Sequence, residues 1–185
     1  MTPERAAKIK RMRCLRQPGL GLILENVNDP HNIYACLRSA DAAGVGHVYI
    51  IHNSFSLQWY ESKRMSAGAV KWLDLHVFND LDSCMKEVKK HYQRILGTFL
   101  GEASSSLYAL DLTQNTALVF GNETHGISEA MRKYTDQNFR IPMMGMVRSL
   151  NISVACAISL YEALRQRQLA GMYNEDGLAL DKTQR

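Results

Sequence analysis

Cysteine is scarce in this chain of 185 residues, and the few cysteines lie far from one another. They are Cys14, Cys36, Cys84 and Cys156. No two of them have the close spacing that zinc sites use, and they do not suggest the disulfide framework of a small secreted domain. The sequence therefore predicts reduced thiols and a cytoplasmic location.

Long apolar runs and the common nucleotide and metal motifs are also missing. The most apolar stretch, residues 150–164, is interrupted by polar side chains such as Asn151 and Glu162, and the basic N-terminus leads into no apolar signal core. There is no glycine-rich dinucleotide loop after a strand, no Walker loop and no His-Glu-x-x-His motif. We therefore expect a soluble protein that is not exported, has no membrane partner and uses no metal cofactor.

Positive charge is concentrated at the N-terminus of a chain whose formal net charge is +4. Within residues 1–17 a single acid, Glu4, is opposed by Arg5, Lys8, Lys10, Arg11, Arg13 and Arg16. Thr2 and Pro3 form the start signal of a helix that should end before Pro18. Residues 1–18 are therefore predicted to form a basic helical arm, and the remaining chain is close to neutral.

Beyond the arm, short apolar runs alternate with helical patterns, an order typical of a parallel α/β sheet flanked by helices. The sequence predicts strands at residues 20–24, 47–51, 73–77, 94–99, 117–120 and 138–141, and helices at residues 30–43, 81–91, 128–134 and 150–168. We expect one catalytic domain over residues 19–170. An irregular connection over the active face is predicted at residues 53–69, and a loosely ordered polar tail at residues 171–185.

A helix start at residues 29–30 is followed by a polar stripe. Helical spacing puts His31, Tyr34, Arg38 and Asp41 on one face of this helix. The stripe could simply face solvent, with Asp41 pairing with Arg38, and spacing by itself favours this interpretation. Its place beyond the carboxyl end of a strand also suits a phosphate and ribose site.

Two later segments have an unusual composition. Residues 120–127 follow an apolar strand and carry two glycines around an acid, which suits close backbone approach to a ligand but is also typical of an ordinary turn. Residues 141–151 contain three methionines, which would be a liability in an exposed loop. We therefore expect the apolar side chains of this loop to be buried, either in the core or as a pocket wall for a ligand such as adenine.

Three segments together resemble the motifs of the SPOUT class of RNA 2'-O-ribose methyltransferases. They are residues 28–32 with 38–45 (NDPHN and RSADAAGV), residues 120–123 (FGNE) and residues 141–151 (IPMMGMVRSLN). The similarity covers roughly residues 3–173, including the basic N-terminal helix and the ending YEALRQRQ. Within the class it is greatest to the enzymes that methylate guanosine 18 of the tRNA D-loop. The chain departs from their pattern at Asn122, Thr124, His125 and Arg148.

The resemblance implies a fold, a cofactor and an assembly. The fold would be a mostly parallel sheet with a C-terminal deep trefoil knot, and S-adenosylmethionine would be the methyl donor. The partner would be tRNA, bound by a homodimer with active sites at the interface. The implied catalytic residues are Arg38, Asn32, Glu123, Ser149 and Asn151, and the implied donor site consists of Thr98, Gly121, Ile141, Met143 and Leu150.

Basic residues on a surface usually just face solvent, but an RNA substrate suggests that some of them bind phosphates. Contacts to tRNA phosphates are predicted for Arg5, Lys8, Arg16, His31, Arg165 and Arg167. For Arg38 two roles are open. It could act as the base, which is unusual for a guanidinium, or it could remain charged and stabilise the 2'-oxyanion while clamping a phosphate.

Three functional classes are compatible with these motifs. The first is methylation of tRNA, the second is 2'-O-methylation of ribosomal RNA or of the tRNA wobble nucleotide, and the third is a non-catalytic RNA-binding relative. The complete set of Asn32, Arg38, Glu123 and Asn151 argues against the non-catalytic class. The short basic arm differs from the separate RNA-binding domain expected of the ribosomal enzymes.

Overall fold

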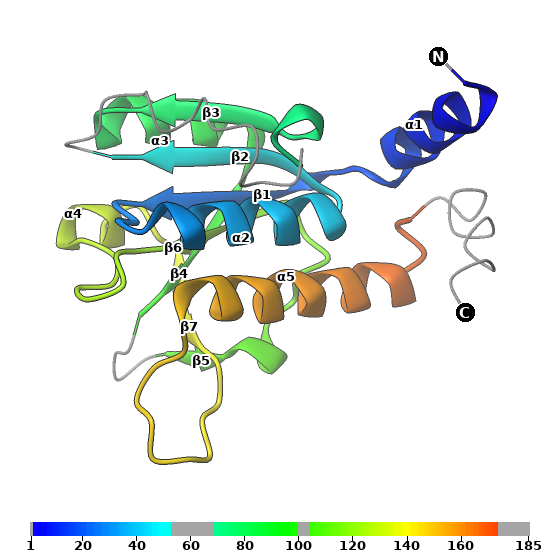
Figure 1. The fold of residues 1–185 in the computed structure, drawn as a ribbon. Coiled ribbons are helices and arrows are strands. Elements are labelled where there is room, and N and C mark those ends of the chain that lie inside the picture. Colours follow the sequence, from blue (N-terminus) through cyan, green and yellow to red (C-terminus); the bar gives the residue numbers. More distant parts are fainter. Residues whose placement is uncertain (1, 53–68, 100–103, 174–185) are drawn as a thin grey trace.

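A wholly parallel sheet forms the middle layer of the computed structural model, which describes residues 2–52, 69–99 and 104–173 (Figure 1). Its seven strands lie in the order β3-β2-β1-β6-β4-β7-β5, and all neighbouring strands pair in parallel. This confirms the predicted α/β class. The strands are β1 (Gln17–Glu25), β2 (Val45–Ile51), β3 (Asp74–Phe78), β4 (Arg94–Thr98), β5 (Ser105–Ser106), β6 (Thr116–Phe120) and β7 (Gln137–Arg140).

Helices cover both faces of this sheet (Figure 1). α2 (Pro30–Ala42) and α5 (Ile152–Leu169) pack on one face, where Leu22 and Leu118 lie in the core. α3 (Leu81–His91) and α4 (Glu129–Arg132) pack on the other face, over Ile23 and Val119. Neighbouring residues of a strand point to opposite faces, so each continuously apolar strand contributes to both cores.

α1 and α2 begin where local sequence signals predict, whereas α5 begins two residues after its predicted start. α1 (Pro3–Leu15) has Thr2 as its N-cap, whose hydroxyl accepts a hydrogen bond from the amide of Arg5 at 3.3 Å. Asp29 caps α2 in the same way, and Asn151 caps α5. The arm is therefore helical as predicted. None of the residues of α1 is buried, so most of its surface faces solvent.

Two features of the sheet were not predicted. β5 consists of two serines without an apolar pattern, so only its pairing with β7 identifies it as a strand. β1 includes Pro18, which we expected to precede the sheet. The register between β1 and β2 shifts between Gln17 and Gly21, so the proline lies where the hydrogen-bond ladder is already interrupted.

The ordered unit extends slightly past the predicted domain boundary at residue 170. Tyr173 is buried, and its hydroxyl donates a hydrogen bond to the carbonyl of Ala43 at 3.0 Å. The connection predicted at residues 53–69 lies outside the described residues except for Ala69, which begins the 3-10 helix η2 (Ala69–Trp72). All four cysteines are free. None of the described helices is both long enough and apolar enough to cross a membrane.

Candidate active site

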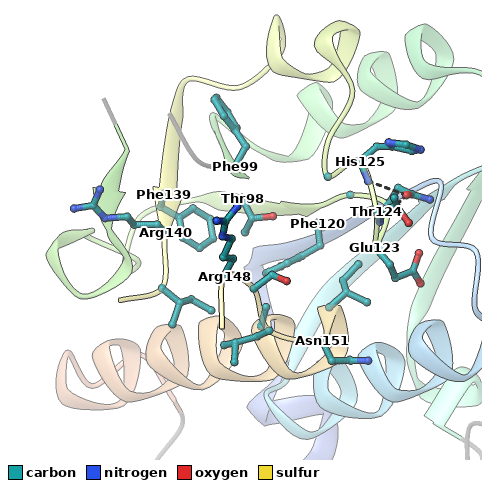
Figure 2. Close-up of a pocket in the computed structure, with 18 of the residues that line it drawn as sticks. Thr98, Phe99, Phe120, Glu123, Thr124, His125, Phe139, Arg140, Arg148 and Asn151 are labelled. Atoms are coloured by element: carbon teal, nitrogen blue, oxygen red, sulfur yellow. Dashed lines mark hydrogen bonds between the residues drawn. The ribbon is translucent and has the colours of Figure 1, made fainter. Parts of the chain in front are cut away.

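A cavity of about 630 Å³ lies at the carboxyl ends of β4, β6 and β7 (Figure 2). Carboxyl ends of parallel strands are where open α/β sheets place their ligands. The cavity brings together all members of the predicted donor site, namely Thr98, Gly121, Ile141, Met143 and Leu150. Glu123, Ser149 and Asn151 of the predicted catalytic set also line it.

Aromatic and aliphatic side chains form the inner wall of this cavity. Phe120 and Phe139 are buried and meet edge to face, with ring centroids 6.4 Å apart. Ile141 and Leu150 are partly buried and extend the apolar wall. The Thr98 hydroxyl donates to the carbonyl of Val119 at 2.9 Å and so is already hydrogen-bonded. Such a wall suits a flat apolar group, as pockets for small ligands commonly do.

The turn after β6 requires a glycine at its first position. A Cβ atom added to Gly121 would lie 2.2 Å from the backbone nitrogen of Ile127, much closer than any van der Waals contact. The turn closes with two backbone hydrogen bonds between Asn122 and Gly126, at 3.0 and 2.8 Å. Asn122 also donates its side-chain amide to the carbonyl of Asn26 at 2.9 Å, which ties the turn to the end of β1. These contacts position Glu123 at the cavity.

A chain of hydrogen bonds joins the three motifs at the cavity rim. Asn32 of α2 donates to Glu123, with Nδ2 and Oε1 3.0 Å apart, and accepts a hydrogen bond from the side-chain amide of Asn151 at 3.0 Å. Glu123 also accepts hydrogen bonds from the backbone amides of Asn28 and Asp29. Burial by itself would raise the pKa of Glu123, but the hydrogen bonds outweigh it and lower the pKa below its usual value. Glu123 is therefore an anion that orients these amides at neutral pH.

Comparison with known proteins agrees with this arrangement. Residues 19–161 match the sequence profile of the SpoU rRNA Methylase family, and this segment contains every residue that lines the cavity. The chain belongs to the SpoU rRNA Methylase family. Over 184 residues it is 36% identical to the tRNA (guanosine(18)-2'-O)-methyltransferase of Escherichia coli strain K12, which covers 100% of this chain and 80% of that protein.

Solved structures of SpoU enzymes have the same fold. The A. aeolicus TrmH/SpoU tRNA modifying enzyme superposes with a TM-score of 0.80 at 32% identity, covering 95% of this chain and 91% of that one. The SpoU methyltransferase AviRb from Streptomyces viridochromogenes, in complex with the cofactor AdoMet, gives a TM-score of 0.71 at 32% identity. That match covers 80% of this chain and 57% of AviRb.

In this SpoU chain, Arg38 stands apart from the other predicted catalytic residues. It lies on an exposed part of α2 and does not line the cavity of its own chain. The predicted ion pair between Arg38 and Asp41 is wrong, because Asp41 pairs with Arg16 at the end of the arm. Tyr34, which spacing put on the same polar stripe, is buried in the core. Only His31 and Arg38 of this stripe are exposed.

Three arginines that received no role from the sequence also line the cavity. Arg132 comes from α4, Arg140 from β7 and Arg148 from the following loop. The guanidinium of Arg132 lies 4.7 Å from the centroid of the Phe99 ring. No local pattern could group these residues, because only the fold brings their segments together. Their combined positive charge suits an anionic substrate such as RNA.

Some of the predicted tRNA contacts are exposed side chains, and others form ion pairs or hydrogen bonds within the protein. Arg5, Lys8 and His31 are exposed, and the side chain of Arg165 is 59% exposed although it pairs with Glu162 at 2.7 Å. The predicted contact at Arg16 loses support, because its guanidinium pairs with Asp41 and donates to the carbonyl of Trp72 at 2.8 Å. Arg16 instead holds the arm against the catalytic domain.

Arg167 is a correction to the sequence-based prediction. Its side chain is 1% exposed and donates hydrogen bonds to the carbonyls of Leu112, Gly19 and Gln114, at 2.9, 2.6 and 2.7 Å. A guanidinium whose donors are used inside the protein has no free face for a phosphate. The predicted tRNA contact at Arg167 is therefore wrong. The positive charge of Arg167 suggested a surface position, and the sequence does not reveal which side of α5 faces inward.

The methionine-rich loop also differs from expectation. Met144 and Met146 are 93% and 99% exposed, and Val147 is 63% exposed. Figure 1 shows why, since the segment between β7 and α5 projects away from the sheet. The prediction that this loop is buried is therefore wrong for these three residues within a single chain. Their exposure leaves an apolar surface beside the cavity that a partner molecule could cover.

Proposed function

We propose that the protein transfers a methyl group from S-adenosylmethionine to the ribose 2'-hydroxyl of guanosine 18 in the D-loop of tRNA. The observation that carries this proposal is the convergence of the three motifs on one cavity, linked at its rim by Glu123, Asn32 and Asn151. The full-length similarity to a tRNA (guanosine(18)-2'-O)-methyltransferase supports the choice of nucleotide.

The cavity fits S-adenosylmethionine in shape and chemistry. Ile141 and Leu150 would hold the adenine against the apolar wall, and the backbone beside Gly121 would approach the donor closely. When bound, S-adenosylmethionine supplies a methyl group on a positively charged sulfur, which an oxygen nucleophile can attack. The cavity walls would hold this group in one orientation, which is the main requirement of a displacement reaction.

The polar residues at the rim prepare the ribose side of the reaction. Glu123 stays ionised and fixes the amide of Asn32, which in turn orients Asn151. The guanidinium of Arg38 stabilises the negative charge that develops on the 2'-oxygen. It also clamps the neighbouring phosphate, which relays the proton of the 2'-hydroxyl to water. We assign Arg38 this electrostatic role rather than that of a base.

The proposed assembly is a homodimer with active sites at the interface. Two features support it: Arg38 is exposed away from the cavity of its own chain, and Met144 and Met146 are exposed beside that cavity. A two-fold interface that covers the methionines would bring Arg38 of one subunit to the cavity of the other. We also propose the trefoil knot of the family, formed where α5 is held against residues 110–114 by Gln166 and Arg167.

Mapping of ribose methylation tests the proposed function directly. The protein is incubated with S-adenosylmethionine and total RNA, and 2'-O-methyl groups are located by the resistance of the adjacent phosphodiester to alkaline cleavage. We expect one new resistant position, guanosine 18 of tRNA, and none when S-adenosylmethionine is left out. New methyl groups in ribosomal RNA or at the wobble nucleotide would select the alternative substrates, and none at all would indicate a non-catalytic relative.

The arm is expected to contribute phosphate contacts through Arg5 and Lys8, the two predicted contacts of α1 that are exposed. Replacing both with glutamine should weaken tRNA binding at low salt. The slope of log affinity against log salt should fall by about 1.4 to 1.8, because each lost contact changes it by about 0.7 to 0.9. A filter-binding or fluorescence titration at several salt concentrations measures both quantities.

A matched control removes the same charge from another surface. Lys86 and Lys89 lie exposed on α3, and their replacement by glutamine should leave the salt slope close to that of the wild type. If the arm variant and the control have the same affinity and slope as the wild type, the arm does not bind RNA. Phosphate recognition would then rest on the arginines that line the cavity.

A further inference from the structure

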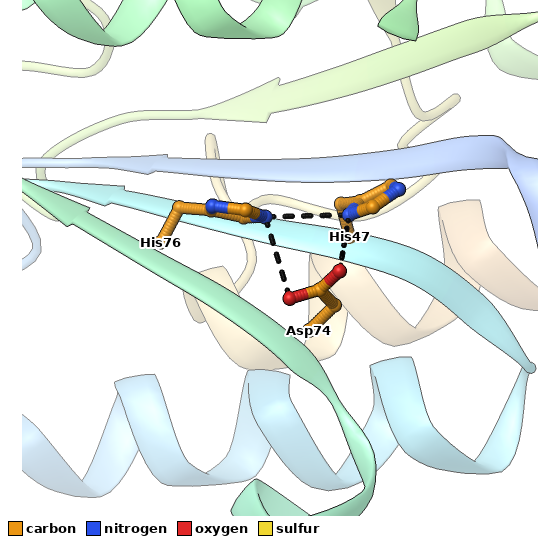
Figure 3. Close-up of side chains that lie close together, drawn as sticks. All are labelled: His47, Asp74 and His76. Carbon is orange, nitrogen blue, oxygen red and sulfur yellow. Dashed lines mark hydrogen bonds and ion pairs between the residues drawn. The ribbon is translucent and has the colours of Figure 1, made fainter.

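Two histidines and an aspartate converge on one face of the sheet (Figure 3). His47 of β2 lies directly across from Asp74 of β3, and His76 follows Asp74 by two residues, so all three side chains point to the same face. Nδ1 of His47 lies 3.0 Å from a carboxylate oxygen of Asp74 and 3.3 Å from Nε2 of His76. The other oxygen of Asp74 lies 3.6 Å from Nε2 of His76.

This His47, Asp74 and His76 cluster belongs to a different end of the molecule from the proposed active site. It lies at the amino ends of β2 and β3, whereas the cavity opens at the carboxyl ends of β4, β6 and β7. None of the three residues lines the cavity. The proposed methyl transfer therefore does not use the three residues of the cluster.

The surrounding side chains hold both imidazole rings in place. The ring of Tyr49 stacks on His76, with centroids 4.8 Å apart and an interplanar angle of 14°. The ring of His91, at the end of α3, lies 4.5 Å from that of His47. The side chains of His47 and His76 are 19% and 26% exposed, whereas that of Asp74 is 62% exposed. The cluster is thus ordered on its inner side and open to water on its outer side.

The distances within the cluster match the coordination of a small transition-metal ion. Zn²⁺ bound by imidazole nitrogen and carboxylate oxygen at about 2.0–2.2 Å in a tetrahedron has ligand atoms roughly 3.3–3.6 Å apart. The two ring nitrogens, 3.3 Å apart, have this separation, and one ligand atom from each of the three residues lies within 4.8 Å of the other two. Small rotations of the side chains would bring all three atoms to the coordination distances of one ion. Hydrogen bonding explains the arrangement less fully. Nδ1 of His47 can donate to Asp74 at 3.0 Å, but the 3.6 Å contact between Asp74 and Nε2 of His76 is too long for a hydrogen bond.

We propose that His47, Asp74 and His76 bind a divalent transition-metal ion, with Zn²⁺ as the best fit and water in the open position. Two imidazoles and a carboxylate favour Zn²⁺ over Mg²⁺ or Ca²⁺, which prefer oxygen ligands alone. The ion ties the edge strand β3 to β2 and stabilises this side of the sheet. The sequence motifs predicted no metal, because the ligands come from two strands and their spacing matches no known metal signature.

Zinc binding by the intact chain is the first test. Purified protein is dialysed against a chelator and then titrated with Zn²⁺ in the presence of excess Mg²⁺, with calorimetry and metal analysis as readouts. We expect one Zn²⁺ per chain. At a hundredfold excess of Zn²⁺ over Kd, the Tm should rise by about 5–10 °C. Absence of stoichiometric Zn²⁺ uptake by the wild type would overturn the proposal.

Variants then locate the ion. His47→Gln and His76→Gln should each lower the Zn²⁺ affinity by more than the roughly 10- to 100-fold that loss of an outer-sphere partner costs. His31→Gln, which removes an exposed histidine elsewhere, should bind Zn²⁺ like the wild type. Circular dichroism without metal checks that each variant is folded. Unchanged affinity in both cluster variants would also overturn the proposal.

The test is independent of the proposed methyl transfer. His76→Gln should methylate RNA at the wild-type rate at a temperature where both proteins are folded, because His76 is remote from the cavity. Failure of the wild type to methylate any RNA would overturn the proposed function and leave the zinc measurements unaffected. Loss of zinc binding in the variants with unchanged methylation is the combined result that we expect.

Discussion

Replacing Arg38 with alanine is expected to lower the rate of methyl transfer by about 10²- to 10³-fold, the usual effect of losing one group that stabilises a developing oxyanion. The affinity for S-adenosylmethionine should not change, because Arg38 does not line the cavity that would hold it. Arg38→Lys should retain only part of the activity, since an ammonium keeps the charge but not the paired donors of a guanidinium. Single-turnover kinetics and calorimetry measure the two quantities.

Ile141→Asp should lower the affinity for S-adenosylmethionine, the quantity that Arg38→Ala should leave unchanged. This substitution places a carboxylate in the apolar wall of the cavity, so donor affinity should fall before RNA binding is affected. If Arg38→Ala weakened donor binding as much as Ile141→Asp does, its assignment to the ribose side would be incorrect. Near-wild-type turnover of Arg38→Ala would remove it from the catalytic set altogether.

If the protein is the proposed homodimer, mixing these two variants tests whether Arg38 serves the partner's cavity. The assay uses a donor concentration at which Ile141→Asp binds little S-adenosylmethionine. After exchange of subunits, half of the proposed dimers would contain one chain of each kind, and each such dimer would have one complete site. About one quarter of the wild-type activity should therefore return. If Arg38 acted on the cavity of its own chain, every site in the mixture would be defective and no activity would return.

Arg167→Met is expected to lower the free energy of unfolding by about 3–5 kcal/mol, because each buried acceptor that loses its donor costs about 1–3 kcal/mol. Methionine replaces the aliphatic part of the arginine side chain but leaves the carbonyls of Leu112, Gly19 and Gln114 without their donors. For a chain of this size the Tm should fall by roughly 10–15 °C. Urea denaturation and calorimetry provide the measurement.

Arg165→Met is the matched control on the same helix. Its guanidinium is 59% exposed and pairs with Glu162 at the surface, so its loss should change stability far less than loss of Arg167. The same pair of variants separates the structural role of Arg167 from the RNA contact predicted from sequence. If folded Arg167→Met were stable but had a reduced salt slope for tRNA binding, the structural assignment would be wrong.

Much of the secondary structure was predictable because its signals are local. α3 spans the predicted residues 81–91, and the caps Thr2, Asp29 and Asn151 lie immediately before their helices. The predicted strands correspond to β1, β2, β3, β4, β6 and β7 within a few residues. β5 was missed because its two serines carry no apolar pattern and form a strand only through pairing with β7.

The positions of the candidate site residues were predictable in part. The donor set converges on the cavity because Thr98 ends β4, Gly121 follows β6, and the remaining members lie in the segment after β7. The carboxyl ends of these three strands lie at the same edge of the sheet. Arg132 and Arg140 were missed because no local pattern distinguishes them from other basic residues, and only the fold brings their segments together. Arg167 was misassigned because a basic residue near the end of a helix has the same local pattern whether it faces solvent or the core.

The sequence by itself determined the elements, the parallel class of the sheet and the motifs that lead to a methyltransferase, since apolar periodicity and capping depend on neighbouring residues. Only the tertiary structure decided which side chains meet. The pairing of Asp41 with Arg16, the burial of Arg167, the exposure of Met146 and the convergence of His47 with His76 all join or separate residues distant in the chain. Such contacts depend on strand register and helix orientation, which arise from packing of the whole domain rather than from any local pattern.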